Sequence, residues 1–114
     1  MSDSIRANWR AAIIPSHGER PVYGRAVLVG SRTATVKAEH NLPPGYACRL
    51  ALMLPKDHPD DEHRFIEGDC VVKLTVLSSS HFHINLQWQG MSGASSSLLD
   101  EQIHRYSGLW RNAR

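Results

Sequence analysis

The chain has 114 residues, of which 41% are hydrophobic and 21% are charged, and its formal net charge is +2. This length accommodates one domain with a single core, and the composition is typical of a soluble globular protein. No apolar stretch approaches the roughly 18–20 residues of a membrane span, and the polar N-terminus does not resemble a signal peptide. We therefore expect one domain over residues 1–114, in the cytoplasm and not inserted into a membrane.

The charge is unevenly distributed along the chain. Residues 1–37 carry six basic and two acidic side chains, whereas residues 38–72 carry three basic and seven acidic ones. An anionic ligand would therefore be attracted to the first third of the chain. This excess of positive charge is too small for the strongly basic surface of a duplex-DNA-binding protein, and we expect no DNA partner.

Residues 21–89 have the composition of a series of short strands. In His81–Trp88, the residues Phe82, Ile84, Leu86 and Trp88 alternate strictly with polar residues, which is the period of a half-buried strand. The other candidate strands, rich in β-branched and apolar residues, are Pro21–Val29, Thr33–Ala38, Ala47–Leu54 and Cys70–Leu77. Strands this short and numerous usually close into a small barrel.

The two ends of the chain differ from this pattern. Residues 1–20 are predicted to form a flexible N-terminal arm, and residues 96–111 an amphipathic helix. Ser97, three residues before Asp100, resembles a capping box at the start of this helix. The apolar residues at helical spacing are Leu98, Leu99, Ile103, Tyr106 and Trp110. The predicted fold class is therefore mainly β: a small antiparallel β-barrel of five to six strands, with an N-terminal arm and one C-terminal helix.

The chemistry-bearing residue types do not form a catalytic or metal-binding pattern. Cys48 and Cys70 lack CxxC spacing and fall in predicted strands, so we predict two buried, reduced thiols. His81 and His83 share a strand face, but no third ligand lies nearby in sequence, which favours polar surface residues over a metal site. We find no nucleophile elbow and no glycine-rich phosphate loop. The sequence predicts a binding protein without a cofactor, not an enzyme.

Arg6 and Arg10 stand four residues apart in the predicted arm, and Trp9 lies between them. Guanidinium groups are planar and permanently charged, bind phosphate bidentately and stack on flat rings. The pair therefore indicates a site for a phosphorylated, ring-bearing ligand, although a solubilising basic tail has the same residues. Trp9 either anchors the arm to the barrel or packs locally in a short turn.

At these residues the chain resembles the PilZ family, bacterial domains that bind the second messenger cyclic di-GMP. Arg6–Arg10 is similar to the family's RxxxR motif, Gly45–Pro55 to its glycine-led strand ending in Leu-Pro, and Ile84–Trp88 to its late IGVxF strand. The resemblance covers nearly the whole chain. It implies the PilZ barrel, cyclic di-GMP as ligand, and two arginines that contact its phosphates and guanine edges.

The family's second motif, D/N-x-S-x-x-G, falls at Val29–Ala34, where only Ser31 matches. The resemblance implies that Val29 replaces the residue that contacts a guanine base, and valine offers no hydrogen bond. Loss of such a bond commonly costs about 1–3 kcal/mol. Ala34 adds a Cβ where the family has glycine and the ligand approaches closely. Arg32, next to Ser31, is a candidate for a compensating phosphate contact.

Two functions follow from the resemblance. The first is a cyclic di-GMP receptor whose arm becomes ordered on binding and presents a surface to an unidentified protein effector, in motility, biofilm or exopolysaccharide control. The second is a degenerate PilZ-fold protein that has lost the ligand and works through protein contacts, as Val29 and Ala34 indicate. A barrel for single-stranded nucleic acid is a weaker third, because Tyr23 alone offers a stacking platform in the basic strand region. We expect the receptor, as a monomer or weak homodimer.

Overall fold

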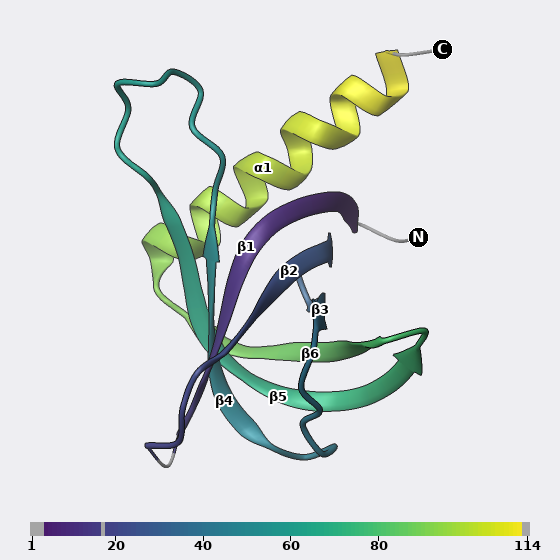
Figure 1. The fold of residues 1–114 in the computed structure, drawn as a ribbon. Helices are drawn as coiled ribbons and strands as arrows, with labels where there is room; N and C mark the ends of the chain where they lie inside the picture. Colours follow the sequence, from purple (N-terminus) through teal and green to yellow (C-terminus); the bar gives the residue numbers. More distant parts are fainter. Residues whose placement is uncertain (1–3, 17, 113–114) are drawn as a thin grey trace.

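Six strands and one helix are present in the computed structural model, which describes residues 4–16 and 18–112, with side chains described to residue 106. The strands form a closed antiparallel barrel in the order β1-β2-β3-β6-β5-β4 (Figure 1). The predicted mainly β class, a small barrel with one C-terminal helix, is confirmed. The elements are β1 (Ile5–Pro15), β2 (Val22–Val29), β3 (Thr33–Ala38), β4 (Ala47–Met53), β5 (Phe65–Ser78), β6 (His81–Met91) and α1 (Gly93–Asn112).

The prediction of a flexible arm over residues 1–20 needs correction, because Ile5–Pro15 is the strand that closes the barrel. β1 pairs with β2 along one edge and with β4 along the other. Its side chains alternate between core and surface, with Ile5, Trp9 and Ile13 buried. This period of two is the signature of a half-buried strand. Residues 1–3 and 17 of the predicted arm lie outside the described residues.

The core fills the barrel and continues under the helix. Leu99 of α1 is buried, and Leu98, Ile103 and Tyr106 pack against the core from the same helix. The ring of Tyr106 lies 6.5 Å from that of Trp9, centroid to centroid, in a tilted arrangement. Figure 1 shows α1 crossing the upper end of the barrel beside β1. The helix therefore covers the end of the core at which β1 begins.

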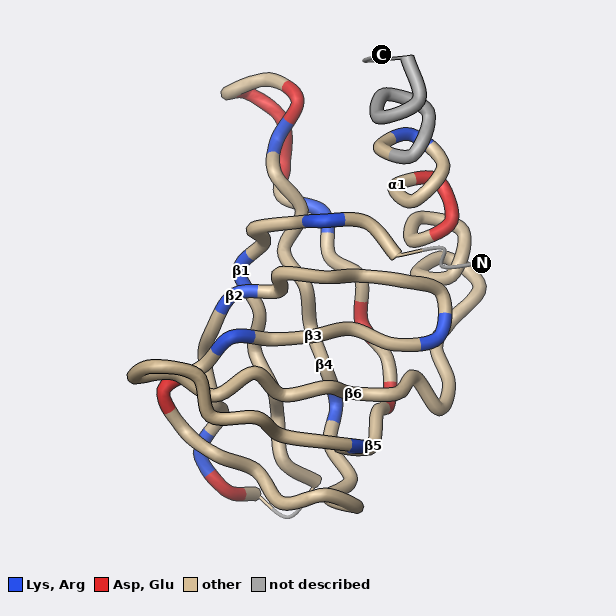
Figure 2. The backbone as a smooth tube through the Cα atoms, turned by 90° about the vertical axis from the view of Figure 1, so that its right-hand side faces the viewer, with Lys and Arg blue, Asp and Glu red and all other residues tan. Residues whose placement is uncertain are grey.

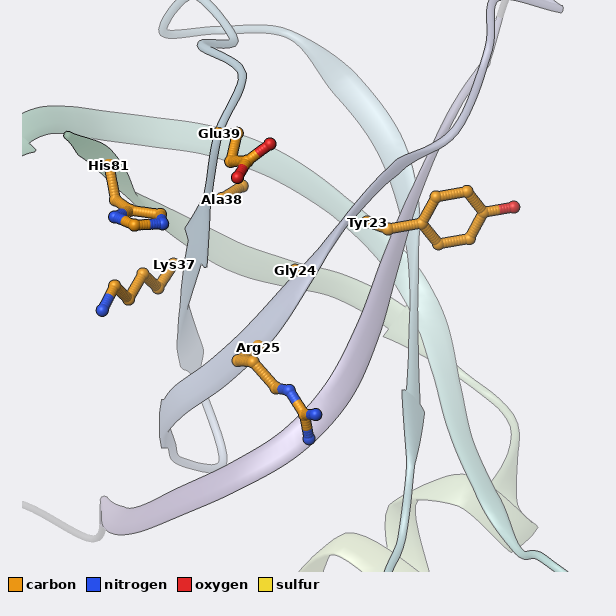
Figure 3. Close-up of a pocket in the computed structure, with 7 residues that line it drawn as sticks. All are labelled: Tyr23, Gly24, Arg25, Lys37, Ala38, Glu39 and His81. Carbon is orange, nitrogen blue, oxygen red and sulfur yellow. The ribbon is translucent and has the colours of Figure 1, made fainter.

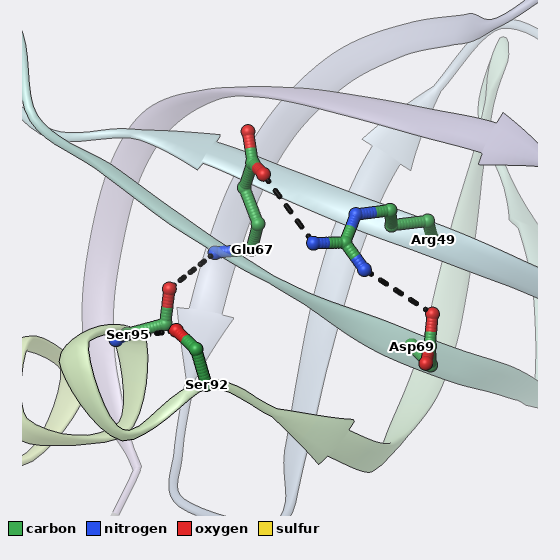
Figure 4. Close-up of polar contacts among 5 residues, drawn as sticks. All are labelled: Arg49, Glu67, Asp69, Ser92 and Ser95. Carbon is green, nitrogen blue, oxygen red and sulfur yellow. Dashed lines mark hydrogen bonds and ion pairs between the residues drawn. The ribbon is translucent and has the colours of Figure 1, made fainter.

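The helix begins at Gly93, three residues before the predicted start. Its cap is Ser92, whose hydroxyl accepts a hydrogen bond from the backbone N–H of Ser95 at 3.1 Å. The predicted cap at Ser97 is therefore wrong, because the first turn is already formed before it. Ser95 in turn accepts a bond from the N–H of Glu67 at 3.2 Å, which joins the helix start to β5 (Figure 4). Among the described residues, no helix has the length and apolar character needed to cross a membrane.

The two cysteines are free and buried, as predicted. Cys48 of β4 and Cys70 of β5 are cross-strand partners. Burial raises the pKa of Cys48 to about 11, and burial, followed by the nearby Cys48 and Asp69, also raises the pKa of Cys70. Because the thiolate is the reactive form of cysteine, both side chains are inert at neutral pH. They serve the core as small apolar groups.

The burial of Trp9 predicts that substitutions in β1 affect stability according to the face on which they lie. We expect Trp9→Ala to lower the free energy of unfolding by about 3–5 kcal/mol, because it removes a large buried side chain and its contact with α1. The exposed neighbour Asn8 provides the control, and Asn8→Ala should change stability by no more than about 0.5 kcal/mol. Urea denaturation followed by far-UV circular dichroism measures both. Equal effects of the two substitutions would contradict a core strand at these residues.

Candidate anion-binding face

Three cations lie side by side on the outer face of the barrel. Arg10 of β1 is the cross-strand partner of Arg25 of β2, and Arg25 is the partner of Lys37 of β3. All three side chains are exposed. Because neighbouring strands are about 4.8 Å apart, the three charges form a row across the sheet, which we call the cationic row (Figure 2).

The cationic row costs the fold some stability. Like charges directly opposite each other in a sheet repel. Within the described residues, the ion pairs involve Arg49, Arg64 and Arg105, and none includes a member of the row. Arg25 donates one long hydrogen bond, of 3.5 Å, to the backbone oxygen of Asn8. A bound anion would relieve this repulsion.

Two cavities open along the cationic row. The first, of about 290 Å³, is lined by Tyr23, Gly24, Arg25, Lys37, Ala38, Glu39 and His81. The second, of about 430 Å³, is lined by Arg10, Ala11, Tyr23, Gly24 and Arg25. They share three residues of β2, and their linings together contain guanidinium, ammonium, phenol, imidazole and carboxylate groups. The larger volume lies within the range of small-molecule sites, and the smaller one lies at its lower limit.

Gly24 allows β2 and β3 to approach closely where the two cavities meet. A Cβ at this position would collide with the carbonyl oxygen of Lys37 and press on the side chains of Val36 and Ala38. Glycine is the one amino acid without a Cβ, so glycine at position 24 permits this close approach of β2 and β3. Figure 3 shows Lys37 and His81 on one side of β2 and Tyr23 on the other. Tyr23 is 71% exposed, so its ring is available to a ligand.

The turn between β2 and β3 forms a separate end of this face. Its backbone is held by a bond from the Gly30 N–H to the Thr33 oxygen, and by Trp88, whose indole N–H donates to the Gly30 oxygen at 3.2 Å. Ser31 and Arg32 are exposed in this turn. The backbone N–H of Trp88 also donates a hydrogen bond to the backbone oxygen of Arg32.

The structure separates the two arginines of the RxxxR motif. Arg6 is the cross-strand partner of Leu28, close to the turn, whereas Arg10 belongs to the cationic row. Four residues of extended strand span about 13 Å. Both arginines are exposed and lie on the same outer face of β1. The two arginines of the motif therefore lie on a paired strand of the barrel and not on a separate arm.

The two non-matching positions of the second motif, and the tryptophan between the two arginines, all lie in the core. Val29 is 0% exposed and Ala34 is 1% exposed, and they are cross-strand partners inside the barrel. A carboxylate at position 29 would be buried among apolar groups, where its ionised form is strongly disfavoured. Trp9 is 6% exposed and packs under α1. Sequence reasoning assigned these residues from a motif, whereas their inward direction follows from strand alternation.

The sequence analysis did not predict that the residues lining the two cavities lie together. Arg25 is distant from Arg10 in sequence and becomes its neighbour through strand pairing, as Lys37 becomes the neighbour of Arg25. Glu39 directly follows β3 and lines the first cavity. Within each strand, the alternation of apolar and polar residues indicates which side chains point outward, but it does not indicate which strands are neighbours. His81 and His83 are half-buried on the outer side of β6. In the part of the chain that the structure describes, no three metal-ligating side chains gather into a cluster.

On β4 and β5, by contrast, an arginine is paired with carboxylates. Arg49 of β4 lies between Glu67 and Asp69 of β5, at 3.4 Å and 3.3 Å (Figure 4). All three side chains are about half exposed or more, so these ion pairs add little stability. They do neutralise the charge. Arg49 is consequently a suitable control for the cations of the row.

Comparison with solved structures supports the fold. A structure of the Bacillus subtilis inhibitor of motility, MotI/DgrA, matches with a TM-score of 0.74 at 17% sequence identity. The match covers 90% of this chain and 48% of that chain. The likeness shows a common PilZ-like fold. No family model matches the chain.

Comparison with curated proteins yields a partial match. A Streptomyces coelicolor protein named glycosyl hydrolase family 109 protein is 35% identical over 75 residues. This alignment covers 61% of the present chain and 16% of that protein. The chain therefore spans a small fraction of the relative's length, and the match does not carry a glycosidase activity to it.

The repulsion within the cationic row predicts a stabilising substitution. Lys37→Gln should raise the free energy of unfolding by about 0.2–1 kcal/mol at low ionic strength, because it removes a like charge directly opposite Arg25. The gain should shrink in 0.5 M NaCl, where exposed charges are screened. Lys73→Gln, on the exposed side of β5, is the control. Thermal unfolding at two salt concentrations measures the effect, and a loss of stability in Lys37→Gln would show that the row is not repulsive.

Proposed function

We propose that this barrel binds cyclic di-GMP on the outer face of β1, β2 and β3 and acts as a ligand-responsive adaptor. The observation that carries the proposal is that Arg25 lines both cavities, together with Lys37 in the first and with Arg10 in the second. Cyclic di-GMP combines two phosphates with two guanines. Guanidinium groups match both parts, since they pair bidentately with phosphate oxygens and with the O6 and N7 acceptors of guanine.

The proposal divides the ligand's contacts between the two ends of the face. Arg10 and Arg25, which line the second cavity together, hold a phosphate, because two cations stabilise one anion more than a single arginine does. Arg6, Ser31 and Arg32 hold the part of the ligand that extends toward the turn. The face is built on strands, so the site is largely pre-formed and binding costs little ordering entropy.

The output of binding differs from the one that a mobile arm would give. Because β1 is already part of the barrel, the ligand cannot act by ordering it. Instead, binding covers a positive surface and replaces it with the exposed edges of the ligand. A protein effector that recognises one of these two surfaces would respond to the ligand. We propose motility, biofilm or exopolysaccharide control as the setting, with motility favoured because the similar structure is of a protein named as an inhibitor of motility.

The second candidate function is that of a PilZ-fold adaptor without a ligand. The core positions of Val29 and Ala34 favour it, because neither residue of the degenerate motif presents polar groups at the surface. Such a protein would use the same positive face to dock an acidic partner directly. Ligand titration distinguishes the two functions.

Isothermal titration calorimetry with cyclic di-GMP tests the proposal. We expect selective binding relative to GTP, and a loss of affinity of about tenfold or more in Arg10→Ala, because the charge-assisted bonds to phosphate are removed. Arg6→Ala should have a smaller effect, since Arg6 does not line the cavities. Arg49→Ala should bind like the parent. Absence of binding by the parent, with an unshifted melting temperature, would support the ligand-free adaptor.

A further inference from the structure

The candidate site needs a group that recognises guanine. The Watson–Crick edge of guanine presents two adjacent donors, the N1–H and the N2 amino group, and a carboxylate accepts from both at once. In the PilZ-like motif this group would stand at position 29, which here is a buried valine. The arginines and lysine of the cationic row are donors only and cannot accept these hydrogen bonds.

Glu39 is the carboxylate among the residues that line the two cavities. It directly follows β3 and lines the 290 Å³ cavity together with Arg25 and Lys37. It is exposed, and none of the ion pairs among the described residues includes it. In Figure 3 its carboxylate is directed toward β2, whereas Lys37 and His81 lie on the other side of β3. Its carboxylate therefore lies on the same side of β3 as Tyr23, away from Lys37, and forms no ion pair with another described residue.

The surroundings of Glu39 fit a base attached to a phosphate. Arg25 belongs to both cavities, so a phosphate held by Arg10 and Arg25 would place its attached nucleoside at the mouth of the first cavity. The exposed ring of Tyr23 lines that cavity as well and offers a surface for stacking. Base stacking on an aromatic side chain is a common source of affinity for nucleotides.

We infer that Glu39 selects guanine over adenine by accepting hydrogen bonds from the N1–H and N2 amino groups of one base of the bound cyclic dinucleotide. The inference rests on the proposed function and names the residue that makes that site specific. A carboxylate in an anion-binding site repels every phosphate and weakens all ligands equally. Its contribution is to specificity, because adenine presents the lone pair of N1, which the carboxylate repels.

The experiment measures the ratio of affinities for two ligands of equal charge, cyclic di-GMP and cyclic di-AMP. Because both carry the same two phosphates, the general electrostatic effect of removing a carboxylate cancels in the ratio. The variants are Glu39→Ala and Glu39→Gln, and Glu62→Gln in the exposed β4–β5 loop is the control of matched charge. Cyclic di-IMP, which lacks the N2 amino group, reports on one of the two hydrogen bonds.

We expect the parent and Glu62→Gln to prefer cyclic di-GMP by about tenfold or more, the range for a hydrogen bond to a charged group. In Glu39→Ala the preference should fall to within about twofold, and the difference between cyclic di-GMP and cyclic di-IMP should fall with it. Glu39→Gln should retain an intermediate preference, since its amide oxygen still accepts one bond.

Each other outcome overturns a defined part of the account. A guanine preference that persists in Glu39→Ala, or a parent that binds both ligands equally, overturns the role of Glu39 and leaves the binding face in place. A parent that binds neither ligand overturns both the proposed function and this inference. Unchanged melting temperatures of the variants are required, and they are expected because Glu39 is exposed.

Discussion

Closure of the barrel by β1 is the constraint on which the rest of the structure depends. This strand supplies partners to two edges at once, and at Arg10 it meets Arg25 on one side and Met53 on the other. An open five-stranded sheet would leave two unpaired edges and an uncovered core. The buried side chains of β1 fix its register, because a slip by one residue would turn Trp9 and Ile13 to the solvent. The same register sends Arg6 and Arg10 outward and places Arg10 beside Arg25.

The two sides of the barrel use charge differently. On β4 and β5, Arg49 is neutralised by the acidic residues on both sides of it. On β1, β2 and β3, three cations stand next to one another without an acidic partner in the described ion pairs. Repulsion of this kind costs up to about 1 kcal/mol per pair, a modest part of a total stability of about 5–15 kcal/mol. A fold with an ordinary core tolerates it, and binding of the proposed ligand, which has two phosphates, would offset it.

Local patterns predicted most of the fold and little of the site. The alternation of Phe82, Ile84, Leu86 and Trp88 identified β6, and helical spacing identified α1, because both signals depend on neighbouring residues alone. β1 carries the same alternation, but its two arginines were interpreted as a mobile motif, which hid the strand. The cationic row was beyond such reasoning, because it depends on cross-strand register between residues up to 27 positions apart, from Arg10 to Lys37. Val29 was interpreted from a motif as the position of a missing base contact, and its burial beside Ala34 could not be predicted from the motif, because burial depends on the three-dimensional fold.

The central claim is that the ligand binds the outer face of three barrel strands and not a separate arm. Backbone amide chemical shifts in an ¹⁵N-labelled sample, recorded while cyclic di-GMP is added, test it most directly. The account predicts saturable shifts that are largest at Arg10, at Tyr23 to Arg25 and at Lys37 to Glu39, with β4 and β5 little affected. Shifts confined to the β4–β5 loop or to α1, or no shifts at saturating ligand, would contradict it.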